Sequence, residues 1–65
     1  MINKSEDFVF GKKYIAPDGK IFEFRYISSN YSNIIFVIFD NGLETYINSD
    51  YYIGSTLLEK NYNIE

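Results

Sequence analysis

The fold is decided by one stretch, Ile34-Ile35-Phe36-Val37-Ile38-Phe39-Asp40-Asn41-Gly42-Leu43-Glu44-Thr45-Tyr46-Ile47, which predicts a β-hairpin. The six apolar residues that open it are all of types enriched in strands. Asn41-Gly42 supplies the two central residues of a type I′ turn, in which both residues need a positive φ. We therefore expect a two-residue loop joining two antiparallel strands.

A two-residue loop fixes which side chains share a face of the hairpin. The expected core face pairs Asp40 with Leu43, Ile38 with Thr45 and Phe36 with Ile47. The opposite face pairs Phe39 with Glu44, Val37 with Tyr46 and Ile35 with Asn48. Because its first strand is apolar on both faces, this hairpin is expected at the centre of a sheet or barrel. We favour burial of Ile35, Val37 and Phe39 over their contact with a partner.

The length of 65 residues allows one small domain, which we place at residues 8–60, with flexible ends at 1–7 and 61–65. The chain has no cysteine and no histidine, so disulfides, thiolate metal sites and the commonest metal ligand are excluded. The core must come from seven tyrosines, six phenylalanines and ten isoleucines. Such an apolar load in so short a chain makes a homo-oligomer conceivable.

A second hairpin is predicted before the central one. Residues 12–16 and 20–27 read as strands, and Pro17-Asp18-Gly19 is a turn in which glycine accepts the left-handed conformation. Its register pairs Tyr14 with Phe22, Lys12 with Phe24 and Lys13 with Glu23, and puts Tyr26 on the same face as Phe22 and Phe24. That aromatic face is the expected core.

The carboxyl-terminal third is predicted to hold one helical turn and one further element. Residues 48–54 resemble a single helical turn that Ser49 or Asp50 caps and Gly54 ends. Residues 55–59 read as a last short strand; the alternative is a short helix, because Thr56 and Glu59 have capping-box spacing.

The order of these elements predicts an all-β protein, a small antiparallel meander or barrel of four to five strands with a one-turn helical connector. The alternative is an α+β fold, an antiparallel sheet with a short C-terminal helix. Short connections and a helical turn before the last strand, over residues 9–59, resemble the layout of SH3-like barrels. The first long loop of peptide-binding SH3 domains is reduced here to Pro17-Asp18-Gly19, which disfavours recognition of proline-rich peptides.

Enzymatic activity is not expected. Acid–base or nucleophilic work would fall to carboxylates, hydroxyls or lysines. Asp40 and Asp50 already have a turn role and a capping role, and Asp40-Asn41-Gly42 lacks the further ligands of a calcium loop. The glycines are scattered singly, so no phosphate-binding loop is present. We expect no catalytic residue, no cofactor and no metal.

The surplus of tyrosines is the most informative functional signal, because tyrosine gives large contact area at low entropic cost. Several tyrosines fall in loops or on faces where full burial is not expected, with carboxylates beside them. The predicted partner-binding residues are Tyr31, Glu44, Tyr46, Asp50, Tyr51 and Tyr52. Such a site suits a basic partner surface, for example that of a nucleic-acid-binding enzyme.

Size and composition resemble those of small phage-encoded inhibitor proteins, including anti-CRISPR proteins, which bind and block a host or defence enzyme. Isoleucine, asparagine, lysine and tyrosine, whose codons are AT-rich, dominate the sequence. The resemblance implies a non-enzymatic protein-binding module acting in the cytoplasm, a location that the lack of a signal peptide and of a long apolar run also favours.

The alternative function is that of a small nucleic-acid-binding β-barrel, and a self-assembling subunit is a third hypothesis. A net charge of −3 disfavours direct nucleic-acid binding.

Overall fold

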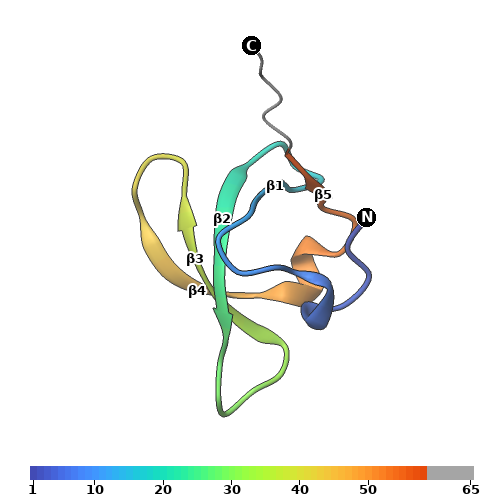
Figure 1. The fold of residues 1–65 in the computed structure, drawn as a ribbon, viewed down its shortest axis with the longest axis vertical. Coiled ribbons are helices and arrows are strands. Elements are labelled where there is room, and N and C mark those ends of the chain that lie inside the picture. The colour runs from blue at the N-terminus through green and yellow to red at the C-terminus, as the bar shows by residue number, and fades with distance from the viewer. Residues whose placement is uncertain (59–65) are drawn as a thin grey trace.

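A computed structural model describes residues 1–58 and shows five antiparallel strands in one open sheet, with the order β4-β3-β2-β1-β5 (Figure 1). The strands are β1 Lys13–Ile15, β2 Ile21–Ile27, β3 Ile34–Phe39, β4 Glu44–Asn48 and β5 Thr56–Leu57, and the two short 3₁₀ turns are η1 Ser5–Asp7 and η2 Ser49–Tyr52. The predicted all-β class is confirmed, including the helical connector before the last strand. Residues 56 and 57 pair with β1, as expected for a strand rather than a helix.

The core lies on one face of the sheet. Its buried apolar residues are Ile2, Phe8, Tyr14, Ala16, Phe22, Phe24, Ile35 and Val37. Phe22 lies at the centre, with ring centroids 5.6 Å from Tyr52, 5.8 Å from Phe8, 6.0 Å from Tyr14 and 6.1 Å from Phe39. Edge-on and offset aromatic pairs of this kind stabilise a core beyond the area they bury. The aromatic face of the first hairpin is therefore core, as predicted.

The first hairpin has the predicted register, with Lys13 opposite Glu23 and Tyr14 opposite Phe22. Its loop is closed by hydrogen bonds from Ala16 N to the Lys20 carbonyl and from Gly19 N to the Ala16 carbonyl, both 2.8 Å. Gly19 has a φ of 92°. Pro17-Asp18-Gly19 thus forms a three-residue loop that ends in a left-handed glycine.

The central hairpin has the same kind of loop, and the predicted type I′ turn is wrong. Phe39 N donates to the Leu43 carbonyl and Gly42 N to the Phe39 carbonyl, each at 2.8 Å, so the loop is Asp40-Asn41-Gly42. Gly42 has a φ of 92°, whereas no non-glycine residue in residues 1–58 has a positive φ, which excludes a type I′ conformation at Asn41. The Asn41 side chain instead accepts a hydrogen bond from Leu43 N.

The third loop residue shifts the register by one and exchanges the two faces of β3 relative to β4. Phe36 lies opposite Tyr46, Ile35 opposite Ile47 and Val37 opposite Thr45. Ile35 and Val37 are fully buried, as expected, whereas Phe39, for which burial was also favoured, is only partly buried. Phe36 and Ile38, which the two-residue loop assigned to the core, share the outer face of the sheet with Tyr46.

A bulge in β2 moves a second aromatic residue to the outer face. Phe24 pairs with Val37 and Tyr26 with Phe36, so Arg25 is an extra residue without a partner on β3. The side chains of Phe24 and Tyr26 therefore point to opposite faces. The prediction that Tyr26 shares the face of Phe22 and Phe24 is wrong for this reason.

The amino-terminal residues are part of the packed structure. Ile2 is buried, and it exchanges backbone hydrogen bonds with the segment after η2: Ile2 N donates to the Ser55 carbonyl and Gly54 N to the Ile2 carbonyl. Figure 1 shows η1, in blue, next to η2, in orange, and the hydroxyls of Ser5 and Ser49 are in contact there. The predicted flexible tail, residues 61–65, lies outside the described residues.

The cap of η2 differs from the prediction by one residue. The Asn48 side chain accepts a hydrogen bond of 2.9 Å from Asp50 N, so Asn48 is the cap rather than Ser49 or Asp50. Ser49 is buried instead, and its N–H donates to the Asn33 carbonyl. Gly54, with a φ of 93°, ends the segment as predicted.

Candidate functional site

Three aromatic side chains form a continuous row across the outer face of β2, β3 and β4. We call Tyr26, Phe36 and Tyr46 the outer aromatic row. The Tyr26 and Phe36 rings are stacked at 5.1 Å with an interplanar angle of 15°, and the Phe36 and Tyr46 rings meet at 4.9 Å and 62°. The row lies directly on paired strand positions, since Phe36 is opposite both tyrosines in the two ladders. The paired strands therefore place the three rings side by side on one face of the sheet.

The two tyrosines at the ends of the row are linked above Phe36. Their hydroxyl oxygens share a hydrogen bond of 3.2 Å. This bond, with a smaller contribution from desolvation, raises the pKa of the Tyr26 phenol above its ordinary value, because the neutral phenol is the form that donates. Tyr26 is nevertheless 49 % exposed and Tyr46 52 % exposed, so both rings are available to a partner.

The charges beside the row are unevenly compensated. Glu23 pairs with Arg25, and the Arg25 guanidinium also lies 4.7 Å from the centroid of the exposed Phe10 ring. Glu44, opposite Ile38 on β4, is exposed and has no ion-pair partner within residues 1–58. The carboxylate that flanks the row on its β4 side is therefore free to meet a cation.

The structure brings together only two of the six predicted partner-binding residues. Glu44 and Tyr46 lie two positions apart on the outer face of β4. Tyr31 is 65 % exposed in the loop between β2 and β3, while Asp50 and Tyr51 are exposed on η2, where Tyr51 reaches 80 %. Within the described part of the chain, neither Tyr31 nor Tyr51 makes an aromatic contact with the outer row. Tyr52 packs against the core.

Sequence reasoning missed Tyr26 and Phe36. Phe36 was assigned to the core because the loop was read as two residues. Tyr26 was also assigned to the core, because the alternation of side chains along β2 was continued through the bulge. The signal for Phe36 was present in the sequence: Asp40-Asn41-Gly42 ends in glycine as Pro17-Asp18-Gly19 does, and both loops adopt the same three-residue form. The bulge at Arg25 has no comparable signal.

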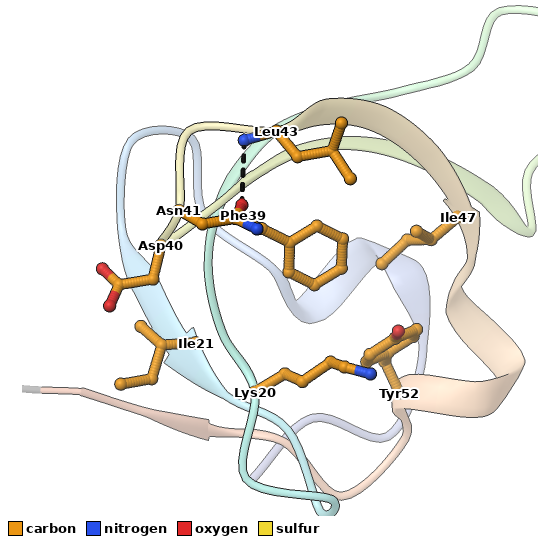
Figure 2. Close-up of a pocket in the computed structure, with 8 residues that line it drawn as sticks. All are labelled: Lys20, Ile21, Phe39, Asp40, Asn41, Leu43, Ile47 and Tyr52. Carbon is orange, nitrogen blue, oxygen red and sulfur yellow. Dashed lines mark hydrogen bonds between the residues drawn. The ribbon is translucent and has the colours of Figure 1, made fainter.

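A second surface feature is an open pocket at one end of the sheet, shown in Figure 2. Its volume is about 470 Å³, and its lining residues are Lys20, Ile21, Phe39, Asp40, Asn41, Leu43, Ile47 and Tyr52. Phe39 forms its centre, and the Asp40 carboxylate points away from it (Figure 2). Lys20 contributes the cation, but its ammonium already lies 3.7 Å from the Asp18 carboxylate. The pocket is thus apolar, with its one ammonium partly neutralised.

Within residues 1–58 no three His, Cys, Asp or Glu side chains lie close enough together to hold a metal ion. No helix in this part of the chain has the length and hydropathy needed to cross a membrane. Both surfaces present aromatic rings, a few hydroxyl groups and isolated charges, which are groups suited to binding a partner.

Comparison with known proteins does not assign the chain to a family, since no protein-family model, no curated protein and no solved structure matches it.

Proposed function

We propose that this chain is a non-enzymatic protein-binding module that recognises its partner through the outer aromatic row. The observation that supports this proposal is that Tyr26, Phe36 and Tyr46 lie in mutual contact on a sheet and two of them stay half exposed. The core does not need them, because it lies on the other face. Clustered tyrosines that are already held in place bind with little loss of side-chain entropy.

The partner surface that fits the row is basic. Glu44 offers an uncompensated carboxylate at one end of the row, and tyrosine faces attract guanidinium and ammonium groups. A lysine or arginine of the partner can therefore lie over the Tyr46 ring and pair with Glu44. Enzymes that bind nucleic acids present such basic surfaces, and blocking one of them would make the module an inhibitor.

The more specific role, a phage-type inhibitor of a host or defence enzyme such as a CRISPR or restriction nuclease, is supported by the small size and the amino-acid composition. The proposed contact surface is aromatic and is bordered by the Glu44 carboxylate. Substrate turnover is not required for this role, because occupation of the partner's basic surface is sufficient.

The test is a pull-down with the tagged chain from bacterial lysate, with and without nuclease treatment, followed by measurement of binding to each purified candidate. Tyr46→Ala is expected to weaken binding by about tenfold or more while changing the melting temperature little. Tyr51→Ala is the matched control, because Tyr51 is more exposed than Tyr46 but lies outside the row. Equal binding by both variants would contradict the proposal.

A second candidate function is supported by the same rings. Aromatic side chains on a small sheet, with Arg25 next to Tyr26 in the sequence of β2, are also a stacking platform for single-stranded nucleic acid. The net charge of −3 and the pairing of Arg25 with Glu23 oppose it. Fluorescence anisotropy with an oligothymidine separates the two: micromolar binding with a steep salt dependence, lost in Tyr46→Ala, would favour this function over the first.

A further inference from the structure

Strand β4 forms an edge of the sheet, with β3 as its neighbour on one side and no strand on the other among the described residues. It is five residues long, and its ladder with β3 runs without a bulge. Edge strands of soluble proteins are usually protected by lysine, proline, a bulge or extreme shortness. β4 has none of these, and its only charge is Glu44. The opposite edge, β5, has only two residues.

The hydrogen-bond phase of the hairpin shows which β4 residues direct their backbone groups outward. Phe39 N donates to the Leu43 carbonyl at one end of the ladder, and Ser49 N donates to the Asn33 carbonyl at the other, each at 2.8 Å. In an antiparallel pair only alternate residues bond to the neighbouring strand. Thr45 and Ile47 therefore bond to β3, while Glu44, Tyr46 and Asn48 turn their N–H and C=O groups away from it.

We propose that β4 pairs with β4 of a second copy of this chain, antiparallel and about a two-fold axis at Tyr46. In this register residue 44 of one copy lies opposite residue 48 of the other, so all five residues of both strands are used. Tyr46 lies opposite Tyr46 of the second copy, and the two exchange both backbone hydrogen bonds. The two open sheets then form one continuous sheet.

Side-chain chemistry favours this register over one with its axis at Glu44. An axis at Glu44 would place two carboxylates directly opposite each other, which is destabilising. The axis at Tyr46 puts Glu44 opposite the neutral Asn48 and Thr45 opposite Ile47. It also makes a tyrosine pair at the junction, so that the two outer aromatic rows join end to end. The dimer does not depend on the proposed function, because it uses the backbone of β4 rather than the exposed ring faces.

The full chain can be tested by sedimentation and light scattering from micromolar to millimolar concentration. The mass is expected to rise from 7.7 kDa to twice that value. Tyr46→Lys places two ammonium groups at the axis and should raise the dimer dissociation constant by about tenfold or more. Tyr46→Phe keeps the ring and should leave the dissociation constant unchanged within about a factor of two.

Single-cysteine variants test the register itself, since the natural chain has no cysteine and every disulfide must join two copies. Residues in a hydrogen-bonded antiparallel pair have Cα atoms about 5.5 Å apart, within disulfide reach. Tyr46→Cys should oxidise to a covalent dimer, whereas the exposed controls Glu44→Cys and Tyr51→Cys should oxidise much more slowly. Circular dichroism confirms that each variant is folded before its mass is compared.

Three outcomes would overturn the inference. The first is a monomer at every concentration, in which case β4 would not pair with a second copy but would be available to a strand of another protein. The second is a dimer whose Glu44→Cys variant cross-links as fast as Tyr46→Cys, which would indicate a different register. The third is growth beyond the dimer, which would indicate head-to-tail pairing rather than a closed two-fold interface.

Discussion

The hydroxyl oxygens of Ser5 and Ser49 lie 2.5 Å apart in the interior, although 44 positions separate the two residues in the sequence. Both side chains are buried. The contact joins η1, near the amino terminus, to η2, the connector between the two edge strands. Ser49 also donates from its hydroxyl to the Asn33 carbonyl, 3.2 Å away. One buried polar cluster thus holds the start of the chain, the β2–β3 loop and η2 together.

The two serines are expected to differ in the cost of their removal. In Ser49→Ala the Ser5 hydroxyl stays buried and loses its partner, so the free energy of unfolding should fall by about 1–3 kcal/mol. In Ser5→Ala the Ser49 hydroxyl keeps the Asn33 carbonyl, so the loss should be about 1 kcal/mol or less. Urea unfolding of both variants and of the double variant measures this. Equal losses for the two single variants would show that the Asn33 bond does not compensate.

The adjacent tyrosines of η2 provide a second contrast. Tyr52 packs against the core with its ring 5.6 Å from that of Phe22, whereas Tyr51 is 80 % exposed. Tyr52→Ala should reduce the free energy of unfolding by about 2 kcal/mol or more, because it opens a cavity next to Phe22. Tyr51→Ala should change it by less than about 0.5 kcal/mol. Thermal melts of the two variants in the same buffer measure this difference. Similar melting temperatures would contradict the packing of Tyr52 against the core.

Gly42 tests the corrected form of the central loop. Its φ of 92° is strained for any residue with a Cβ, although a Cβ there would meet no atom within 4 Å. Gly42→Val should therefore lower the free energy of unfolding by about 1–2 kcal/mol through backbone strain alone. Gly42→Asn is the matched control, because asparagine tolerates the left-handed region better, and its loss should be smaller. An unchanged melting temperature in Gly42→Val would remove the left-handed assignment.

The same loop shows how far the sequence predicts this fold. Apolar runs and turn residues predicted the strands, with a helix as the alternative for the last one, the helical connector and the register of residues 13–15 with residues 21–23. The register of the central hairpin depended on one residue, because Asp40-Asn41-Gly42 can form a two-residue or a three-residue loop. In the native loop Asn41 stays at negative φ and its side chain accepts from Leu43 N. That single difference exchanged the faces of the six residues of β3 relative to β4.

The candidate site was less predictable than the fold for a physical reason. Side chains alternate between the two faces of a strand, and the length of a loop or the presence of a bulge decides which residues face the core. Tyr46 and Glu44 were identified from the surplus of tyrosines and from the expected outer face of the hairpin, and both lie on the exposed face. Tyr26 and Phe36, which complete the row, required knowledge of the bulge at Arg25 and of the loop length. Ile2 and Ser5 were missed because their packing depends on a contact with residues more than 40 positions away.

The hydroxyl bond in the outer aromatic row predicts a pH dependence. Because the pKa of Tyr26 is raised in the folded state, the bond stabilises the fold at pH values below the ordinary tyrosine pKa of about 10. This stabilisation is lost as the pH rises through the raised pKa. Absorbance titration of the phenolates should show one tyrosine ionising later than an exposed one. Tyr46→Phe removes the hydroxyl that bonds to Tyr26 and should return the pKa of Tyr26 toward its ordinary value. An unaltered titration would show that the bond is not formed in solution.

The bulge at Arg25 makes the last prediction. Phe24 pairs with Val37 and Tyr26 with Phe36, so deletion of Arg25 converts the bulge into a regular ladder without moving any other residue to the opposite face. The deletion variant should fold with the core intact and keep the raised pKa of Tyr26. Its free energy of unfolding should fall by about 1–2 kcal/mol through the altered twist and the lost contact with Phe10.

Deletion of Glu23 is the matched control. It exchanges the faces of the residues on one side of the deletion, so that Phe22 and Phe24 can no longer both enter the core, and the chain should fail to fold. Circular dichroism and amide NMR spectra of the two deletions measure the contrast. If the Arg25 deletion unfolds the chain as the Glu23 deletion does, the fold requires the bulge. The bulge would then do more than turn the Tyr26 side chain to the outer face.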